Sequence, residues 1–135
     1  AGLAPDSFRM VDGSGLSRYN LISADSSVAL LAFMHRHSLA DRFRHTLPRY
    51  SVDLKELPWP TTADRPFDPL FVAAKSGGMT SVSTISGYLT TLAGRDLAFS
   101  LLANGYLGPN APVLDLRRRV WRILVQYQPL DNSAP

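Results

Sequence analysis

The first regular pattern in the chain is an apolar stripe at helical spacing in residues 24–37. Val28 and Leu31 lie three positions apart, and neighbouring apolar residues widen the stripe into one helix face. Ser23 precedes the stretch and suits an N-cap, and Asp25 adds a negative charge in the first turn, where it complements the helix dipole. These positions predict a helix over 24–37.

The segment 70–104 has the pattern of β-strands. An apolar run at its start, residues 70–74, predicts a short strand that leads to Lys75. Residues 81–90 alternate two sets of side chains and are rich in Val, Thr, Ile and Tyr, which is typical of a strand. Residues 97–103 are almost continuously apolar, which predicts a strand that is central or covered on both faces. With a hairpin turn at 93–96, the segment predicts a three-stranded antiparallel unit.

An apolar stripe at helical spacing returns in residues 110–127 and predicts a second helix. Asn110 suits its N-cap, and Pro112 falls in the first turn, where a missing N–H group does no harm. Four arginines give this helix a cationic side, which favours a solvated face over a nucleic-acid or acidic-lipid site. The four are Arg117, Arg118, Arg119 and Arg122. The order of elements predicts an α+β fold, with the C-terminal helix packed on the sheet.

Composition is that of one globular domain. The chain has 135 residues, of which 45% are hydrophobic and 19% charged, so it can bury a core. The net charge is +3 and most basic residues are dispersed, so we predict no nucleic-acid partner. No apolar run approaches the roughly 20 residues that cross a bilayer. The first residues lack the basic and apolar regions of a signal peptide, which favours a cytosolic protein or a mature or excised piece.

Candidates for a metal site are weak. The chain has no cysteine, which excludes disulfides and thiolate metal sites. His35 and His37 lie two positions apart, so on a helix they point to different faces, and no carboxylate repeats at ligand spacing around them or His45. A basic, solvated helix end explains them more simply, and we expect neither a metal nor a cofactor.

Residues 41–69 predict no long regular element, because five prolines interrupt them. Within this segment, Leu57-Pro58-Trp59-Pro60 suits either a polyproline-like ligand for an aromatic groove or a surface loop pinned by Trp59. The surface loop is the interpretation that the composition favours.

Candidate chemistry concentrates in Lys75, Ser76, Gly77 and Gly78. The chain has only one other lysine, Lys55. A lysine where a strand meets glycines can fix an anion, while the glycines let another backbone come close. Short motifs have high false-positive rates, and local spacing alone favours a surface lysine beside a glycine-rich turn.

Two separated segments together resemble the D-alanyl-D-alanine carboxypeptidase/endopeptidases, the class C low-molecular-mass penicillin-binding proteins. Residues 12–22 begin with D-G-S-G-L-S-R-Y-N and look like the family's DGSGLSR-x-N segment. About 55 residues further on, Lys75-Ser76-Gly77 is similar to the family's K-[ST]-G motif, and the hairpin after it is similar too. The resemblance is strong over 8–37 and 70–127 and weak over 40–69. It implies that residues 1–135 are the C-terminal part of a serine β-lactamase/penicillin-binding-protein-like domain.

The resemblance further implies an acyl-serine mechanism in the bacterial cell envelope, in the periplasm or another extracytoplasmic place. A serine would attack terminal D-Ala-D-Ala in peptidoglycan stem peptides, and β-lactams would acylate the same serine. Lys75 would supply positive charge, Ser76 would donate to the substrate's terminal carboxylate, and the Gly78 N–H would form one arm of the oxyanion hole. Gly77 would let the strand lie close to the substrate. Four more residues would line the cleft: Leu16, Arg18, Met79 and Thr80.

The nucleophile that this mechanism needs is missing from the chain. The residues three before the two lysines are Val52 and Val72, so there is no S-x-x-K motif, and no asparagine has a serine two positions before it, so there is no S-x-N motif. In the family, both motifs lie N-terminal to the D-G-S-G segment. We therefore predict that an N-terminal segment of the same protein supplies them, and that this chain alone is inactive.

A chain of this kind would expose apolar surface, which predicts a partner segment or self-association. Two alternatives stay open. The chain is a non-catalytic module of the same fold that holds peptidoglycan peptides, or it is an unrelated α+β interaction domain with a chance K-S-G. The coding sequence upstream of Ala1 would discriminate the enzyme from the non-catalytic module. A Lys75 mutation without effect on peptide or β-lactam binding would favour the unrelated domain.

Overall fold

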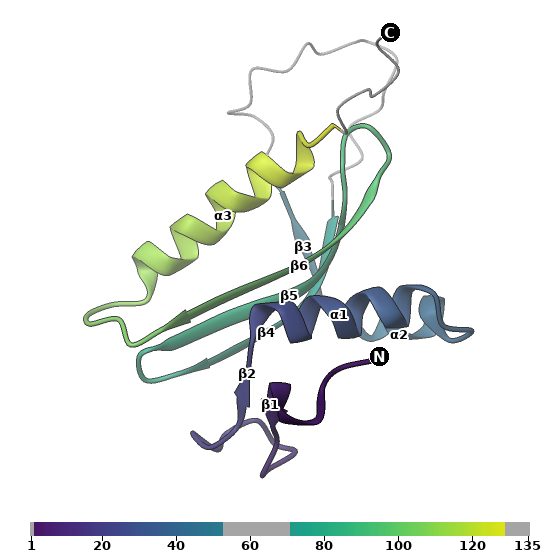
Figure 1. The fold of residues 1–135 in the computed structure, drawn as a ribbon. Helices are drawn as coiled ribbons and strands as arrows, with labels where there is room; N and C mark the ends of the chain where they lie inside the picture. The colour runs from purple at the N-terminus through teal and green to yellow at the C-terminus, as the bar shows by residue number, and fades with distance from the viewer. Residues whose placement is uncertain (1, 53–70, 129–135) are drawn as a thin grey trace, which may run out of the picture.

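The computed structural model describes residues 2–52 and 71–128, in which helices lie on both sides of one main sheet (Figure 1). In chain order the elements are η1 (Pro5–Ser7), β1 (Phe8–Arg9), β2 (Leu21–Ile22), α1 (Ala24–His35), α2 (Ala40–Thr46), β3 (Arg49–Ser51), β4 (Phe71–Met79), β5 (Val82–Thr90), β6 (Asp96–Asn104) and α3 (Ala111–Val125).

The main sheet has four antiparallel strands in the order β3-β4-β5-β6. The β4–β5 register runs from Val72 opposite Leu89 to Met79 opposite Val82, so these two strands pair along nearly their whole length. By contrast, β3 pairs only with the first three residues of β4. The strands β1 and β2 form a separate two-stranded ribbon.

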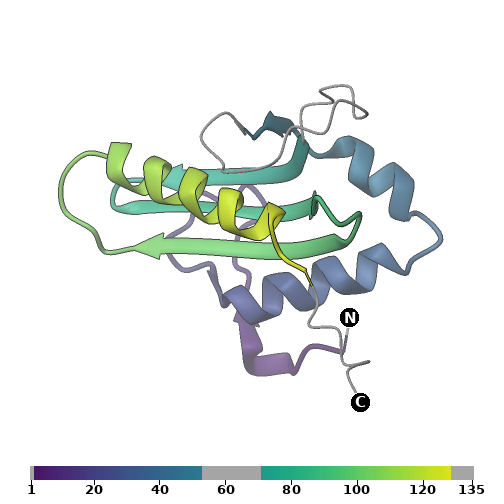
Figure 2. The same cartoon turned by 90° about the horizontal axis from the view of Figure 1, so that it is seen from above.

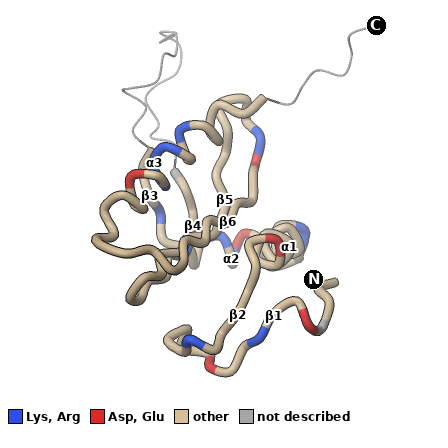
Figure 3. Tube along the Cα trace, turned by 60° about the vertical axis from the view of Figure 1, so that its left-hand side comes forward, with Lys and Arg blue, Asp and Glu red and all other residues tan. Residues whose placement is uncertain are grey.

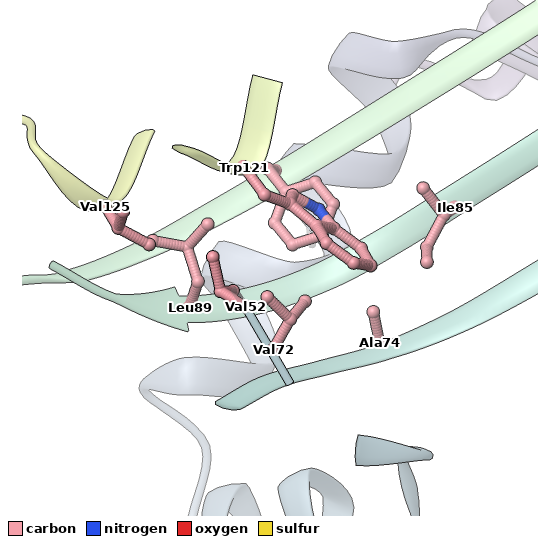
Figure 4. Close-up of a cluster of buried hydrophobic side chains, with 8 residues drawn as sticks. Val52, Val72, Ala74, Ile85, Leu89, Trp121 and Val125 are labelled. Carbon is pink, nitrogen blue, oxygen red and sulfur yellow. The ribbon is translucent and has the colours of Figure 1, made fainter. Parts of the chain in front are cut away.

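Helix α3 covers one face of the sheet, and α1 lies on the other (Figure 2). Trp121 and Val125 of α3 pack against buried residues that the strands direct to that face. Since successive strand residues point to opposite faces, these contacts come from alternate positions, such as Ile85 and Leu89 on β5. The cluster, shown in Figure 4, consists of Val52, Val72, Ala74, Ile85, Leu89, Phe99, Trp121 and Val125.

The opposite face of the sheet is joined to α1 and α2 by Tyr88. Its side chain is 3% exposed and packs with Leu31 and Leu47. The Tyr88 hydroxyl donates to the carbonyl oxygen of Leu31 at 2.7 Å, and the Arg44 guanidinium carbon lies 5.1 Å from the Tyr88 ring centre. Burial raises the pKa of the Tyr88 hydroxyl, so this link stays protonated. It fixes α1 against β5 and β6.

The predicted α+β fold and the alternation along β5 are confirmed. Ser23 caps α1, because its hydroxyl accepts from the Ser26 N–H at 3.0 Å. Asn110 occupies the N-cap position of α3, but its side chain makes no capping bond and instead accepts from the Tyr106 hydroxyl at 3.0 Å. Both helices end two residues earlier than the sequence pattern indicated, α1 at His35 and α3 at Val125.

Two expectations about the segments around the sheet were wrong. The strand before the glycines does not stop at Ala74, because Gly77 and Gly78 both pair with β5 and carry β4 to Met79. The segment 41–69 was expected to be irregular, but α2 and β3 occupy most of its described part. Strand β6, by contrast, fits its prediction: within the described residues it is the sheet edge, and it is covered on both faces through Phe99 and Ala98.

The expected loop or polyproline-like segment around Trp59 lies outside the described residues. Arg118 and Arg119 are exposed on α3, as predicted, whereas Arg117 is half-buried over aromatic rings. Basic positions on α3 and its neighbours appear blue in Figure 3. In the part of the chain that the structure describes, no helix combines the length and apolarity that a bilayer crossing needs.

Candidate functional site

The outer edge of β4 is the candidate site. On this edge β3 reaches only the start of β4, and the Ala74 N–H donates to the carbonyl oxygen of Pro48 at 2.9 Å. Backbone N–H groups alternate between the two edges of an antiparallel strand, so the N–H groups of Ser76 and Gly78 point to the same edge as that of Ala74. Among the described residues no strand pairs with β4 there beyond Ala73. The Gly78 N–H is therefore a donor directed to an open strand edge.

The ammonium group of Lys75 lies at this same edge. Its Nζ donates to the carbonyl oxygen of Ser76 at 2.6 Å, and that carbonyl shares the edge with the Ser76 N–H. The side chain is exposed. A positive charge and the Gly78 N–H thus lie along one edge, an arrangement suited to a negatively charged or strongly polarised ligand.

Ser76 and Gly77 point to opposite faces of β4. Ser76 is half-buried on the α3 face, where its Oγ lies 3.2 Å from the Tyr50 hydroxyl. A Cβ atom at Gly77 would lie 2.9 Å from the Thr84 Oγ1, which itself donates to the Gly77 carbonyl at 3.3 Å. The glycine therefore makes room for its cross-strand neighbour as well as leaving the strand edge unobstructed.

The D-G-S-G segment is a loop held together by its own polar side chains. The Asp12 carboxylate accepts from the Ser14 hydroxyl at 2.5 Å and from backbone N–H groups of Ser14, Leu16 and Ser17. These bonds, led by that from the Ser14 side chain, hold the pKa of Asp12 below its usual value. Asn20 closes the loop from its other end, accepting from two N–H groups and donating to the Asp12 carbonyl at 2.8 Å.

Arg18 brings this loop to the end of β4. An Arg18 guanidinium nitrogen lies 3.5 Å from the carbonyl oxygen of Thr80, which follows β4 in the turn to β5. Leu16 is 74% exposed on the same loop, and Met79, the last residue of β4, is half-buried. The structure thus brings Arg18 to Thr80 and leaves Leu16 open to a ligand or another segment.

Sequence reasoning missed the residues that support the site. Asp12 and Asn20 belong to a segment whose Gly, Ser, Asp and Asn content predicts a loop, but that composition does not show that these two side chains order it. Tyr50 carried no signal, because its segment was expected to be irregular. Asp12 accepts from the Leu16 N–H, and the Tyr50 hydroxyl contacts that of Ser76.

The histidines are used elsewhere. The His35 ring packs 6.2 Å from the Tyr88 ring, and the Nδ1 of His37 accepts from the Leu39 N–H at 3.1 Å. Within residues 2–52 and 71–128, no three His, Asp or Glu side chains are grouped to bind a metal ion. What the described edge can do chemically is bind and polarise a ligand.

Comparison with known proteins matches residues 1–118 to the D-Ala-D-Ala carboxypeptidase 3 (S13) family. A D-alanyl-D-alanine carboxypeptidase of Actinomadura sp. (strain R39) is 38% identical over 114 residues, which cover 81% of this chain and 21% of that protein. The D-alanyl-D-alanine carboxypeptidase DacB of Haemophilus influenzae (strain ATCC 51907 / DSM 11121 / KW20 / Rd) is 28% identical over 130 residues, or 87% of this chain and 26% of that one.

Two solved structures have the same fold. The crystal structure of penicillin binding protein 4 (dacB) from Haemophilus influenzae matches with a TM-score of 0.73 and 26% identity, over 93% of this chain and 29% of that chain. The same protein complexed with a novel β-lactam matches with a TM-score of 0.70 and 26% identity, over 89% and 29%. The chain thus spans about a quarter of the length of the curated relatives it matches.

Proposed function

Because the chain belongs to the D-Ala-D-Ala carboxypeptidase 3 (S13) family, we propose that it is the C-terminal part of a serine-type D-Ala-D-Ala carboxypeptidase. The complete enzyme would act on peptidoglycan stem peptides, be acylated by β-lactams, and work in the periplasm or another extracytoplasmic place. The observation that carries the proposal is the open edge of β4, to which Lys75 and the Gly78 N–H are both directed.

In this proposal the substrate peptide lies along β4 and adds a strand to its open edge. Lys75 supplies positive charge, and the Ser76 hydroxyl donates to the terminal carboxylate of the substrate. The Gly78 N–H donates to the oxygen that becomes negative when the carbonyl is attacked, a type of contact whose loss costs about 10²–10³ in rate. Arg18 and Leu16 flank the cleft from the D-G-S-G loop, and Met79 and Thr80 lie at its far end.

The attacking serine and its base would come from an N-terminal segment that carries S-x-x-K and S-x-N. Two observations support this. Neither motif occurs in the chain, and the chain spans only about a quarter of its relatives. In addition, large apolar side chains on the β1–β2 ribbon and its loop are exposed, Met10 at 70% and Leu21 at 60%, as are Leu30 and Phe33 on α1. We expect the N-terminal segment to cover them, and the isolated chain to self-associate.

The test is covalent labelling with a fluorescent penicillin. We expect the product of the complete gene to be labelled and the isolated 135-residue chain to remain unlabelled. Replacing Lys75 by alanine in the complete product should slow labelling by about 10²-fold, the scale of one lost oxyanion-type contact. Lys55→Ala, which removes the only other lysine of the chain, is the matched control and should label normally. A complete product that is never labelled would refute the enzyme proposal.

The absence of both motifs also supports a second candidate function. If no other segment supplies a nucleophile, the same β4 edge would bind peptidoglycan peptides without cleaving them. This module would bind a D-Ala-D-Ala peptide in a Lys75-dependent manner and would release no D-alanine.

A further inference from the structure

Tyr50 reaches from β3 to the K-S-G motif, although the two are not register partners. The residue opposite Tyr50 on β4 is Val72, four positions before Ser76. The side chain of Tyr50 packs on the α3 face of the sheet, and its hydroxyl lies 3.2 Å from the Ser76 Oγ. Either oxygen can be the donor at this distance.

Two side chains of α3 fix the Tyr50 ring in this place. The Trp121 ring centre lies 5.7 Å from that of Tyr50, and the Arg117 guanidinium carbon lies 5.8 Å from it. Trp121 is itself only 4% exposed within the main core, and Arg117 also lies 5.2 Å from its ring centre. Because these contacts restrict the ring, the Tyr50 hydroxyl is held against Ser76 before any ligand arrives.

We propose that Tyr50 is a positioning residue that sets the direction of the Ser76 hydroxyl and thereby selects ligands with a free terminal carboxylate. The proposal rests on the proposed function of Ser76. A phenol is the more acidic of the two hydroxyls, so Tyr50 donates and Ser76 accepts. The Ser76 proton is then free to point out of the Tyr50 contact and to be donated to a carboxylate. Without Tyr50, the Ser76 hydroxyl rotates and this donor is no longer pre-oriented.

The consequence is a preference for one chemical class of ligand. A peptide that ends in a carboxylate accepts the proton of Ser76, whereas the same peptide with a C-terminal amide offers a weaker, uncharged acceptor. Tyr50 therefore increases the difference in affinity between the two peptides and contributes little to the binding that both have in common.

The experiment compares a D-Ala-D-Ala-terminated peptide with its C-terminal amide as competitors of fluorescent-penicillin labelling, in the product of the complete gene. The ratio of the two inhibitory concentrations measures carboxylate preference. In Tyr50→Phe, which keeps the ring packed, this preference should fall about three- to tenfold, the effect of one lost hydrogen bond. In Ser76→Ala it should fall at least as far, and adding Tyr50→Phe to Ser76→Ala should lower it no further, because the two residues act as one unit.

Tyr106→Phe is the matched control, because it removes a tyrosine hydroxyl bonded to Asn110 far along the chain from β4. It should leave the preference unchanged, and all variants should melt within a few degrees of the wild type. If the wild type is labelled but Tyr50→Phe keeps or increases the carboxylate preference, the role of Tyr50 is overturned and the proposed function is not. A wild type that takes no label would overturn the proposed function and this inference with it.

Discussion

Gly87 is the residue at which one added methyl group should disturb the candidate site most, without touching it. A Cβ atom built at Gly87 on β5 would overlap the backbone of β4, at the carbonyl oxygen of Ala73 and at 2.5 Å from the Cα of Ala74. Carbon atoms in contact normally lie about 3.5–4.0 Å apart. Both of these atoms belong to the backbone of β4, so no rotamer change relieves the overlap. Strands β4 and β5 must therefore separate by about 1 Å.

The loss of stability in Gly87→Ala follows from the contacts that such a separation breaks. Gly87 lies opposite Ala74, and the neighbouring pair is Ala73 with Tyr88. Losing about two ladder hydrogen bonds at ~0.5–1.5 kcal/mol each, together with overpacking of ~1–3 kcal/mol, gives roughly 2–6 kcal/mol for Gly87→Ala. The damage is centred one residue before Lys75, so the β4 edge should move with it.

The assay is urea unfolding followed by circular dichroism, with penicillin labelling of the same samples. Gly13→Ala is the matched control, because a Cβ atom there meets nothing within 4 Å and no unusual backbone angle is needed. It should change the free energy of unfolding by less than about 1 kcal/mol. If Gly87→Ala is as stable as this control, or labels as fast as the wild type, then the close approach of β4 and β5 has been misassigned.

Three further changes test other parts of the structure. Tyr88→Phe removes the bond to the Leu31 carbonyl and should cost about 1 kcal/mol, seen as a lower melting temperature; an unchanged value would refute this link between α1 and the sheet. The hydrogen bond from Arg44 holds the pKa of Asp96 below its usual value, so the pair stabilises the fold above about pH 4 and this stability is lost as the pH falls through the folded pKa. In Asp96→Asn, the free energy of unfolding should therefore fall less steeply below pH 4 than in the wild type. A pH profile identical to that of the wild type would contradict this role of the Arg44–Asp96 pair. Asn20→Ala opens the D-G-S-G loop and should slow penicillin labelling about ten- to hundredfold with little change in melting temperature, whereas normal labelling would show that the loop's order is irrelevant.

The strands and helices that sequence alone predicted are those whose side chains follow a period. On β5, Tyr88 and Ile85 point to opposite faces, as the alternation required, because the pleat of a strand has a fixed period of two. The short helix α2 has no buried residue and therefore no apolar stripe to reveal it. Strand β3 is three residues long and follows Pro48, so its pairing with β4 had no local signal.

The candidate site likewise has residues that the sequence predicts and contacts that it does not. Lys75, Ser76 and Gly78 could be singled out from the motif and its spacing from the D-G-S-G segment. The direction of the Gly78 N–H depends on the contact between Ala74 and Pro48, which is set by tertiary pairing. The contact of Tyr50 with Ser76 depends further on how α3 packs, and residues 50 and 121 are far apart in the chain. Such contacts follow from the fold rather than from any local pattern.

In the proposed mechanism, these 135 residues hold the ligand while a serine outside them attacks it. Mass-spectrometric mapping of the residue that penicillin acylates in the complete gene product tests this most directly. We predict a single modified serine outside residues 1–135, three positions before a lysine. A penicilloyl group on any serine within residues 1–135 would contradict the account.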